Sequence, residues 1–133
     1  MVDHLTPEQR HVLMSTIRSK DTLPERVVRK TVHGLGFRFR LHKKDLPGKP
    51  DLVFPRIKKV IFVHGCFWHG HKCKSIPKSN VEFWKDKLSR NIARDKKNIR
   101  ELKKLGWTAL VVWECRTRNS EKLKMILLHF LEK

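Results

Sequence analysis

The sequence lacks the features that would assign it to a membrane, a secretory pathway or a multidomain chain. No hydrophobic run approaches the roughly 20 residues that a helix needs to cross a bilayer. The first ten residues, MVDHLTPEQR, lack the apolar stretch of a signal peptide. No Gly/Ser/Pro-rich or single-sign stretch divides the 133 residues. We therefore expect one domain, 1–133, in a soluble intracellular protein with no membrane partner.

Acidic residues are scarce. The chain has 13 Asp and Glu against 31 Lys and Arg, which gives a formal net charge of +18 at pH 7. Hydrophobic residues make up 39% of the chain, which is enough for a modest core. A cationic excess of this size therefore indicates a polyanionic partner.

Cysteine is also scarce. Cys66, Cys73 and Cys115 are the three in the chain, and an odd number in a reducing cytosol argues against a disulfide framework. Metal ligation and simple burial remain as explanations for them.

Helical and strand patterns alternate along the chain. Apolar residues three and four apart predict helices, and alternation or short apolar runs predict strands. The second helix has a cap near Asp21 or Thr22. The predicted elements are helices over 5–20 and 21–36, a strand over 37–42, a hairpin of strands 51–54 and 60–63 in which Phe54 pairs with about Val60, a long helix over 81–104, a strand over 108–113 and a last helix capped by Ser120.

The strand ends are predicted to meet at one edge of the sheet. A crossover through the long helix makes strands 60–63 and 108–113 parallel, so their carboxyl ends lie together. The hairpin brings Asp51 to the same end, opposite Val63 or His64. Open α/β sheets usually place their sites at this edge. We therefore expect chemically capable residues to converge there, namely Asp51, His64, Cys66 and Cys115.

Three of the possible metal ligands lie within eight residues. Cys66, His71 and Cys73 form a C-x4-H-x-C pattern, and Cys115 reaches the same sheet end to complete a four-ligand set suited to zinc. A closed set of four protein ligands is typical of structural zinc. The alternatives are that Cys115 is a buried thiol and the other two are loop residues, or that His69 replaces His71.

Three carboxylates occupy positions where solvated acids are not expected. Asp51 starts a strand, and Asp95 and Glu25 fall on apolar helix faces. Buried carboxylates need a cation or hydrogen-bond donors, and magnesium fits because it takes one or two carboxylates together with substrate phosphate. His64 and His69 are suited to the proton transfers. The alternatives are a turn residue for Asp51, a helix salt bridge for Asp95 and a favourable first-turn charge for Glu25.

Aromatic residues cluster beside these candidate ligands. Phe67 and Trp68 lie among them, and Trp84 starts the basic helix. Apolar side chains inserted between base steps kink a duplex, whereas packing in the core or in a zinc loop is the common explanation for aromatics. The basic helix is either a solvated face or a phosphate-contacting surface.

Together these stretches resemble the very-short-patch-repair (Vsr) mismatch endonucleases. The matching segments are LPGKPDLVF, VIFVHGCFWHGHKC, EFWKDKLSRNIARD, LGWTALVVWEC and, less specifically, STIRSKDT. The resemblance implies the α/β fold of restriction endonucleases, a mixed sheet flanked by helices, here with a structural zinc site. It implies nicking of duplex DNA on the 5′ side of the thymine in a T:G mismatch. It also implies a cytoplasmic, nucleoid-associated monomer with mismatch-repair proteins as possible partners.

The resemblance also assigns roles to individual residues. Asp51 becomes a ligand of catalytic Mg²⁺, aided by the main-chain carbonyl of Val63, and His69 becomes the base that activates water. The groups implied to surround them are His64, Asp95 and Glu25. The implied ligands of structural Zn²⁺ are Cys66, His71, Cys73 and Cys115. The implied DNA contacts are the aromatic wedge Phe67, Trp68 and Trp84, together with Lys87, Asn91, Met14 and a helical arm over 1–20.

The second strand departs from a pattern that many related nucleases share. It carries FVHGCFWH where they place an acid-x-lysine motif, so His64 and His69 are expected to cover those roles. Two alternative functions stay open: a sequence-specific restriction-type nuclease of the same fold, and a noncatalytic zinc DNA-binding module. The module has no need of an acid at a strand start that faces a histidine, so Asp51 and Asp95 discriminate against it.

Overall fold

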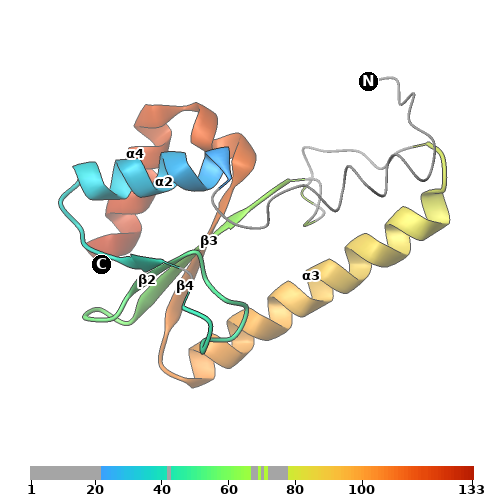
Figure 1. The fold of residues 1–133 in the computed structure, drawn as a ribbon, viewed down its shortest axis with the longest axis horizontal. Coiled ribbons are helices and arrows are strands. Elements are labelled where there is room, and N and C mark those ends of the chain that lie inside the picture. Colours follow the sequence, from blue (N-terminus) through green and yellow to red (C-terminus); the bar gives the residue numbers. More distant parts are fainter. Residues whose placement is uncertain (1–21, 42, 67–68, 70, 72–77) are drawn as a thin grey trace.

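The computed structural model describes residues 22–41, 43–66, 69, 71 and 78–133. Its sheet has four strands in the order β1-β2-β3-β4 (Figure 1). The first two pairings are antiparallel and the pairing of β3 with β4 is parallel, so the predicted α/β class with a mixed sheet is confirmed. The elements are α2 (Leu23–Gly34), β1 (Arg40–Leu41), β2 (Leu52–Phe54), β3 (Lys59–His64), α3 (Val81–Lys104), β4 (Thr108–Trp113), a 3₁₀ turn (Glu114–Arg118) and α4 (Ser120–Leu131).

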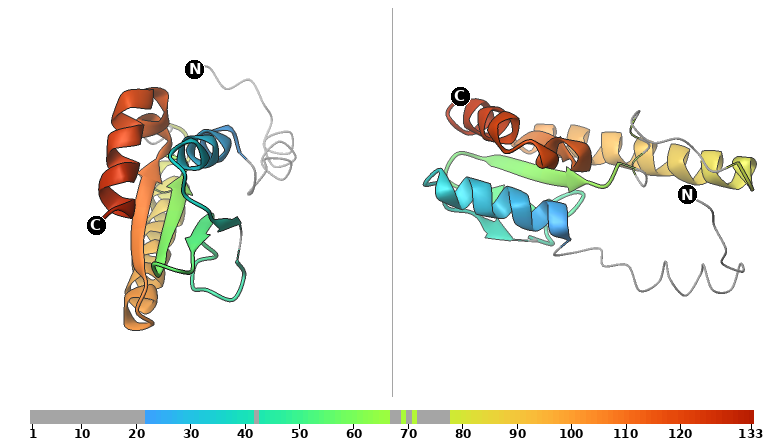
Figure 2. Two further views of the ribbon diagram at one scale, coloured as in Figure 1. Left: turned by 90° about the vertical axis from the view of Figure 1, so that its left-hand side faces the viewer. Right: turned by 90° about the horizontal axis from the view of Figure 1, so that it is seen from above.

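Helices cover both faces of the sheet because successive strand residues point to opposite sides. Leu52 and Ile61 pack with residues of α2 and α4, among them Leu123. Val53 packs on the other face in one cluster with Leu102 of α3. Figures 1 and 2 show α2 and α4 on one side of the sheet and α3 on the other.

The two shorter helices begin at side-chain caps. Thr22 caps α2 as predicted: its hydroxyl accepts from the Glu25 N–H, and the Glu25 carboxylate accepts from the Thr22 N–H. The cap of α4 is Asn119, whose side chain accepts from the Lys122 N–H at 3.1 Å. The prediction of Ser120 as the cap was therefore wrong by one residue, because Asn119 offers an equally good acceptor.

The hairpin register also differs by one residue from the prediction. Phe54 pairs with Lys59, and Val60 pairs with Val53. The turn is shorter than expected because Lys58 adopts a left-handed conformation, with φ of 55°, and the strand resumes immediately after it. Asp51 still reaches β3: its N–H donates to the Ile61 carbonyl at 3.1 Å.

The remaining elements follow the prediction closely, with one exception. The long helix and the strand over 108–113 have the predicted bounds. The strand predicted over 37–42 is reduced to Arg40–Leu41 in the described residues, because its partner β2 is itself only three residues long. The helix predicted over 5–20 lies outside the described residues. No helix in the described part of the chain is long and apolar enough to cross a membrane.

The long helix α3 reaches beyond the sheet. Its C-terminal half packs beside β4 through Ile99 and Leu102, and its N-terminal half projects past the end of β3 (Figure 1). Residues in the middle of α3 therefore lie next to the carboxyl ends of the parallel strands.

Candidate active site

A cavity of about 580 Å³ opens between the ends of β2 and β3 and the middle of α3. Sequence reasoning predicted that the strand ends would converge, and the structure confirms it. The cavity brings together, among others, Asp51, Val63, His64, His69 and Asp95.

Asp51 sits in the cavity as a carboxyl group whose charge is poorly compensated. One of its oxygens accepts a hydrogen bond from the Val63 N–H at 2.7 Å. Burial raises the pKa of Asp51 from 3.8 to about 7, against the opposing effect of the Val63 bond. The Glu25 carboxyl raises this pKa further, and the Arg29 guanidinium lowers it. A cation bound beside Asp51 would therefore favour the ionised carboxylate, and the carboxylate would in turn help to hold the cation.

His69 and Asp95 form the closest polar pair in the cavity. His69 Nδ1 lies 2.5 Å from Asp95 Oδ2, and both side chains are largely buried. Asp95 thus pairs with a loop histidine and not, as the alternative had it, with a basic neighbour on its own helix. Since an ionised carboxylate only accepts, Nδ1 carries the proton and Nε2 is left as the basic nitrogen.

His64 lies directly against His69. The two imidazole rings are stacked, with centroids 3.7 Å apart and planes within 4° of parallel. His64 is buried, and its Nδ1 has no hydrogen-bond partner within the described residues. Burial lowers the pKa of His64 from 6.5 to about 4, and the charges of His69 and Arg94 act in the same direction. His64 is therefore neutral at pH 7.

Glu25 on α2 acts on Asp51 through its charge. Its side chain is 2% exposed, and its charge raises the pKa of Asp51. The first-turn alternative also holds, because Glu25 completes the capping box of α2 with Thr22. Glu25 thus helps to start the helix and does not line the cavity.

A second group of possible ligands lies beside the cavity. Ligand atoms of Cys66, His71 and Cys115 lie within 4.8 Å of one another, and Cys115 Sγ is 3.7 Å from His71 Nδ1. The Cys66 sulfur accepts from the Cys115 N–H at 3.4 Å. The fourth predicted ligand, Cys73, lies outside the described residues. These thiol and imidazole donors could hold a metal ion.

Trp113 at the end of β4 separates the two groups. Its ring stacks on His71, with centroids 4.2 Å apart and an interplanar angle of 17°. It meets His64 edge-on at 5.3 Å, as expected from the strand register that pairs these two residues. Trp113 therefore contacts one residue of the ligand cluster and one residue of the cavity.

Comparison with known proteins identifies the family. A model of the family described as DNA mismatch endonuclease Vsr matches residues 2–75. The chain is 48% identical to type II nicking enzyme V.XorIIP of Xanthomonas oryzae pv. oryzae, covering 99% of this chain and 98% of that protein. It is 43% identical to DNA mismatch endonuclease Vsr of Escherichia coli K12, covering 83% of this chain and 72% of that protein. The chain belongs to the Vsr family.

Membership fixes the enzyme class. A Vsr-family chain is a DNA endonuclease, and DNA is its substrate. The family also implies a divalent metal, and the two ligand groups of this Vsr-family chain offer places for metal ions. The similarity to V.XorIIP covers 99% of this chain and therefore extends past residue 75.

The predicted DNA contacts of this Vsr-family chain are only partly described. Phe67, Trp68 and Met14 lie outside the described residues. Lys87 and Asn91 line a second cavity of about 530 Å³ on α3. Trp84 is only 3% exposed, whereas its neighbour Phe83 is 57% exposed. Trp84 is thus packed in this structure and would have to leave its position to insert between bases.

Sequence reasoning missed several basic residues of the cavity. Lys44, Lys49 and Arg94 line it, and the Arg29 charge acts on Asp51. Spacing could have found Arg29, which lies four positions after Glu25 on the same face of α2. No local pattern indicates Lys49. Arg94 was hidden in a helix with many basic residues.

Proposed function

We propose that this protein is a magnesium-dependent endonuclease that nicks one strand of duplex DNA on the 5′ side of the thymine in a T:G mismatch. The observation that carries the proposal is the position of Asp51 in one cavity with the paired His69 and Asp95, in a chain of the Vsr family. A noncatalytic DNA-binding module has no use for this arrangement.

The chemistry of Asp51 fits magnesium, which prefers oxygen ligands. Asp51 and the main-chain carbonyl of Val63 would hold the ion, and the Val63 N–H orients the carboxylate. When bound, magnesium would offset negative charge on the scissile phosphate and on the leaving oxygen. The raised pKa of Asp51 supports this assignment, because a cation replaces the proton that burial otherwise favours.

His69 is the proposed general base. Asp95 holds the ring with Nδ1 protonated and stabilises the imidazolium that forms when Nε2 accepts a proton from water. His64 stays neutral beside it, so the stacked rings never carry two positive charges. Neutral His64 can still donate a hydrogen bond to the phosphate or to the leaving oxygen. Attack of the water oxygen on phosphorus breaks the bond to the 3′-oxygen, which takes up a proton from solvent, so the products are a 3′-hydroxyl and a 5′-phosphate.

Zinc is the proposed occupant of the cluster formed by Cys66, His71 and Cys115, with Cys73 as the fourth ligand. Tetrahedral zinc has Zn–S bonds of about 2.3 Å and Zn–N bonds of about 2.0 Å, which place sulfur and nitrogen ligands roughly 3.5 Å apart. The distance of 3.7 Å between Cys115 Sγ and His71 Nδ1 agrees with this geometry. Its role is structural, since all four positions are filled by protein.

Mismatch recognition is assigned to the N-terminal arm and to α3. Met14 on the arm over 1–20, Lys87 and Asn91 on α3, and the aromatic residues Phe67, Trp68 and Trp84 are the proposed contacts. The position of Lys87 and Asn91 in one cavity on the exposed part of α3 supports this assignment. We propose that residues 1–133 form one domain that acts as a monomer.

The test is a nicking assay on two duplexes that differ only in a T:G mismatch or a T:A pair, each with and without magnesium. We expect a single nick 5′ to the thymine of the mismatched duplex, with magnesium present. Cutting of both duplexes at equal rates would remove mismatch specificity and leave a restriction-type nuclease. No cutting of either duplex by zinc-loaded protein would contradict the proposed activity.

A further inference from the structure

Two elements that line the cavity each contribute a cation that the mechanism above does not use. Lys49 comes from the loop between β1 and β2, and Arg94 comes from α3. Both residues are exposed, and neither side chain makes a hydrogen bond or ion pair within the part of the chain that the structure describes. Among the nearby basic residues, Lys44 also lines the cavity, whereas Lys43 pairs with Asp45 and Arg90 pairs with Asp86.

The position of Lys49 is fixed by its loop. Leu46 of that loop is buried in the α3-side core. A Cβ on Gly48 would lie 3.0 Å from both the Asn98 Cβ and the Phe62 ring, so this part of the backbone is packed against α3 and β3. The Lys49 N–H donates to the Leu46 carbonyl at 3.1 Å, and the next residue, Pro50, is fully buried.

The backbone at Lys49 is in the left-handed region, with φ of 50°. Glycine or asparagine meets that conformation at lower cost than lysine. The same conformation occurs in the hairpin turn at Lys58, but Lys49 differs from Lys58 because it lines the cavity. Strained positions of this kind occur at ligand-binding sites.

Arg94 lines the same cavity from α3, together with His64 and His69. It directly precedes Asp95, and its charge lowers the pKa of His64. Arg94 also lines the second cavity, the one that contains Lys87 and Asn91. It is therefore the residue that connects the two cavities of α3.

The cavity combines acidic residues with an anionic substrate. Asp51 and Asp95 are both acidic, and the phosphodiester that enters is an anion that gains further negative charge as water adds to phosphorus. We propose that Lys49, from the loop between β1 and β2, and Arg94, from α3, form a clamp that binds the non-bridging oxygens of the scissile phosphate. Arginine suits one side because its planar fork can bind two phosphate oxygens, and lysine supplies a point charge. This inference depends on the proposed function, because it assumes that the scissile phosphate binds in this cavity.

Contacts that strengthen as charge develops act on the chemical step more than on binding. We expect Lys49→Met and Arg94→Met each to lower the single-turnover nicking rate by about 10- to 100-fold. Affinity for the same mismatched duplex without magnesium should fall by only about 3-fold, since many other phosphate contacts remain. Because both side chains are exposed, thermal unfolding should be unchanged.

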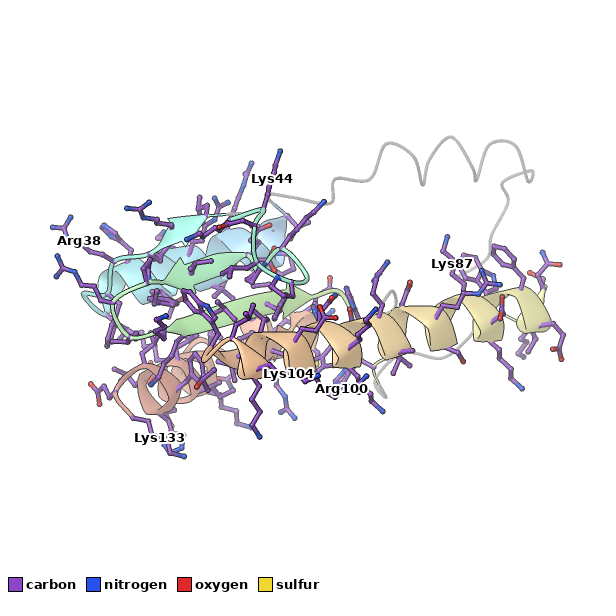
Figure 3. All side chains as sticks on the ribbon, turned by 90° about the horizontal axis from the view of Figure 1, so that it is seen from below. Arg38, Lys44, Lys87, Arg100, Lys104 and Lys133 are labelled. Carbon is purple, nitrogen blue, oxygen red and sulfur yellow. The ribbon has the colours of Figure 1, made fainter. Side chains whose placement is uncertain are left out.

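Matched controls come from the same two elements. Lys43→Met removes a lysine from the same loop that does not line the cavity. Arg100→Met removes an arginine of α3 from the side opposite Lys87 (Figure 3). Both controls should nick at the wild-type rate. A loss of nicking rate in the controls equal to that in Lys49→Met and Arg94→Met would overturn the clamp. So would a reduced DNA affinity in Lys49→Met and Arg94→Met with an unchanged single-turnover rate.

A binding experiment tests the contact without requiring turnover. A methylphosphonate replaces the phosphate 5′ to the mismatched thymine, which removes its charge, and a second duplex carries the same change several nucleotides away. When the scissile phosphate is replaced, the wild type should lose more affinity, relative to unmodified DNA, than Lys49→Met or Arg94→Met does. When the distant phosphate is replaced, all three proteins should lose the same affinity. An equal loss at the scissile position in all three proteins would contradict the clamp, even if nicking itself follows a different specificity.

Discussion

The two ligand groups at the end of the sheet differ in their donor atoms and in what surrounds them. The cluster of Cys66, His71 and Cys115 offers sulfur and imidazole at metal-ligand spacing. The cavity offers the Asp51 carboxylate, two stacked histidines and open volume for a substrate. Soft donors select zinc, and hard oxygen donors select magnesium. We propose that the first group is a structural zinc site and the second the catalytic site; the ring of Trp113 contacts a residue of each.

The largest expected effect is a loss of nicking when Asp51 of the cavity is changed, without a loss of zinc from the cysteine cluster. Asp51→Asn keeps the shape of the side chain and an acceptor for the Val63 N–H, but removes the charge that holds a cation. Nicking should fall by roughly 10³-fold or more, because a metal supplies several kcal/mol of transition-state stabilisation. Zinc content, measured by metal analysis, should stay as in the wild type. Loss of zinc in this variant would mean that the groups are not independent.

The next effect concerns the base. Asp95→Asn removes the carboxylate that orients His69 and stabilises its imidazolium. The single-turnover rate should fall by about 10²-fold, within the usual range for general-base catalysis. Glu101→Gln is the control, since Glu101 lies on the same helix and lines neither cavity. A rate for Asp95→Asn equal to that of the control would remove Asp95 from the mechanism.

A third experiment decides which histidine belongs to which group. His71→Ala and Cys115→Ala should lose zinc and about 3 kcal/mol or more of unfolding free energy, since the binding energy of a structural zinc contributes to folding. His69→Ala should retain zinc and lose nicking. His129→Ala, on α4, should retain both. Zinc loss in His69→Ala with retention in His71→Ala would reverse the assignment.

The smallest effect is a pH dependence of stability without magnesium. The folded-state pKa of Asp51, about 7, lies above its ordinary 3.8. Protonated Asp51 therefore contributes to folding stability, fully below about pH 4, and this contribution is lost as the pH rises through 7. Asp51→Asn should accordingly gain stability over the wild type as the pH rises from 4 to 8, by about 1 to 2 kcal/mol.

The difference between the two proteins is the quantity to measure, by denaturant unfolding at each pH. His64 has the opposite dependence, because its lowered pKa makes the fold less stable as the pH falls from 6.5 toward 4. This contribution is common to both proteins and cancels in the difference. A difference that shrinks as the pH rises would contradict the burial of an ionisable Asp51.

Much of the fold follows from local signals in the sequence. The apolar period of α3, the run TALVVW and the long crossover predict the parallel pairing of β3 with β4. That pairing in turn predicts that His64 and Cys115 lie at one sheet end. The exact hairpin register could not be predicted from the sequence, because the backbone conformation of Lys58 decides whether the strand resumes at residue 59 or 60.

The site was predictable in its members and less so in its contacts. Buried acids on apolar faces indicated Asp95 and Glu25, but nothing local to α3 indicates that Asp95 pairs with His69 across the cavity. The stacking of His64 on His69 likewise depends on how a loop folds back over a strand. Exposed cations such as Lys49 and Arg94 have no period or burial signal that separates them from the rest of a strongly basic surface.

The central claim is that the zinc cluster and the magnesium cavity are separate sites, and one measurement tests it directly. Purified protein is depleted of weakly bound metal, its zinc content is determined, and nicking of the mismatched duplex is followed as magnesium is added back. We predict about one zinc per chain throughout, no nicking without magnesium, and full restoration by magnesium alone. Zinc that is lost together with activity, with nicking regained only when zinc is returned, would contradict the account.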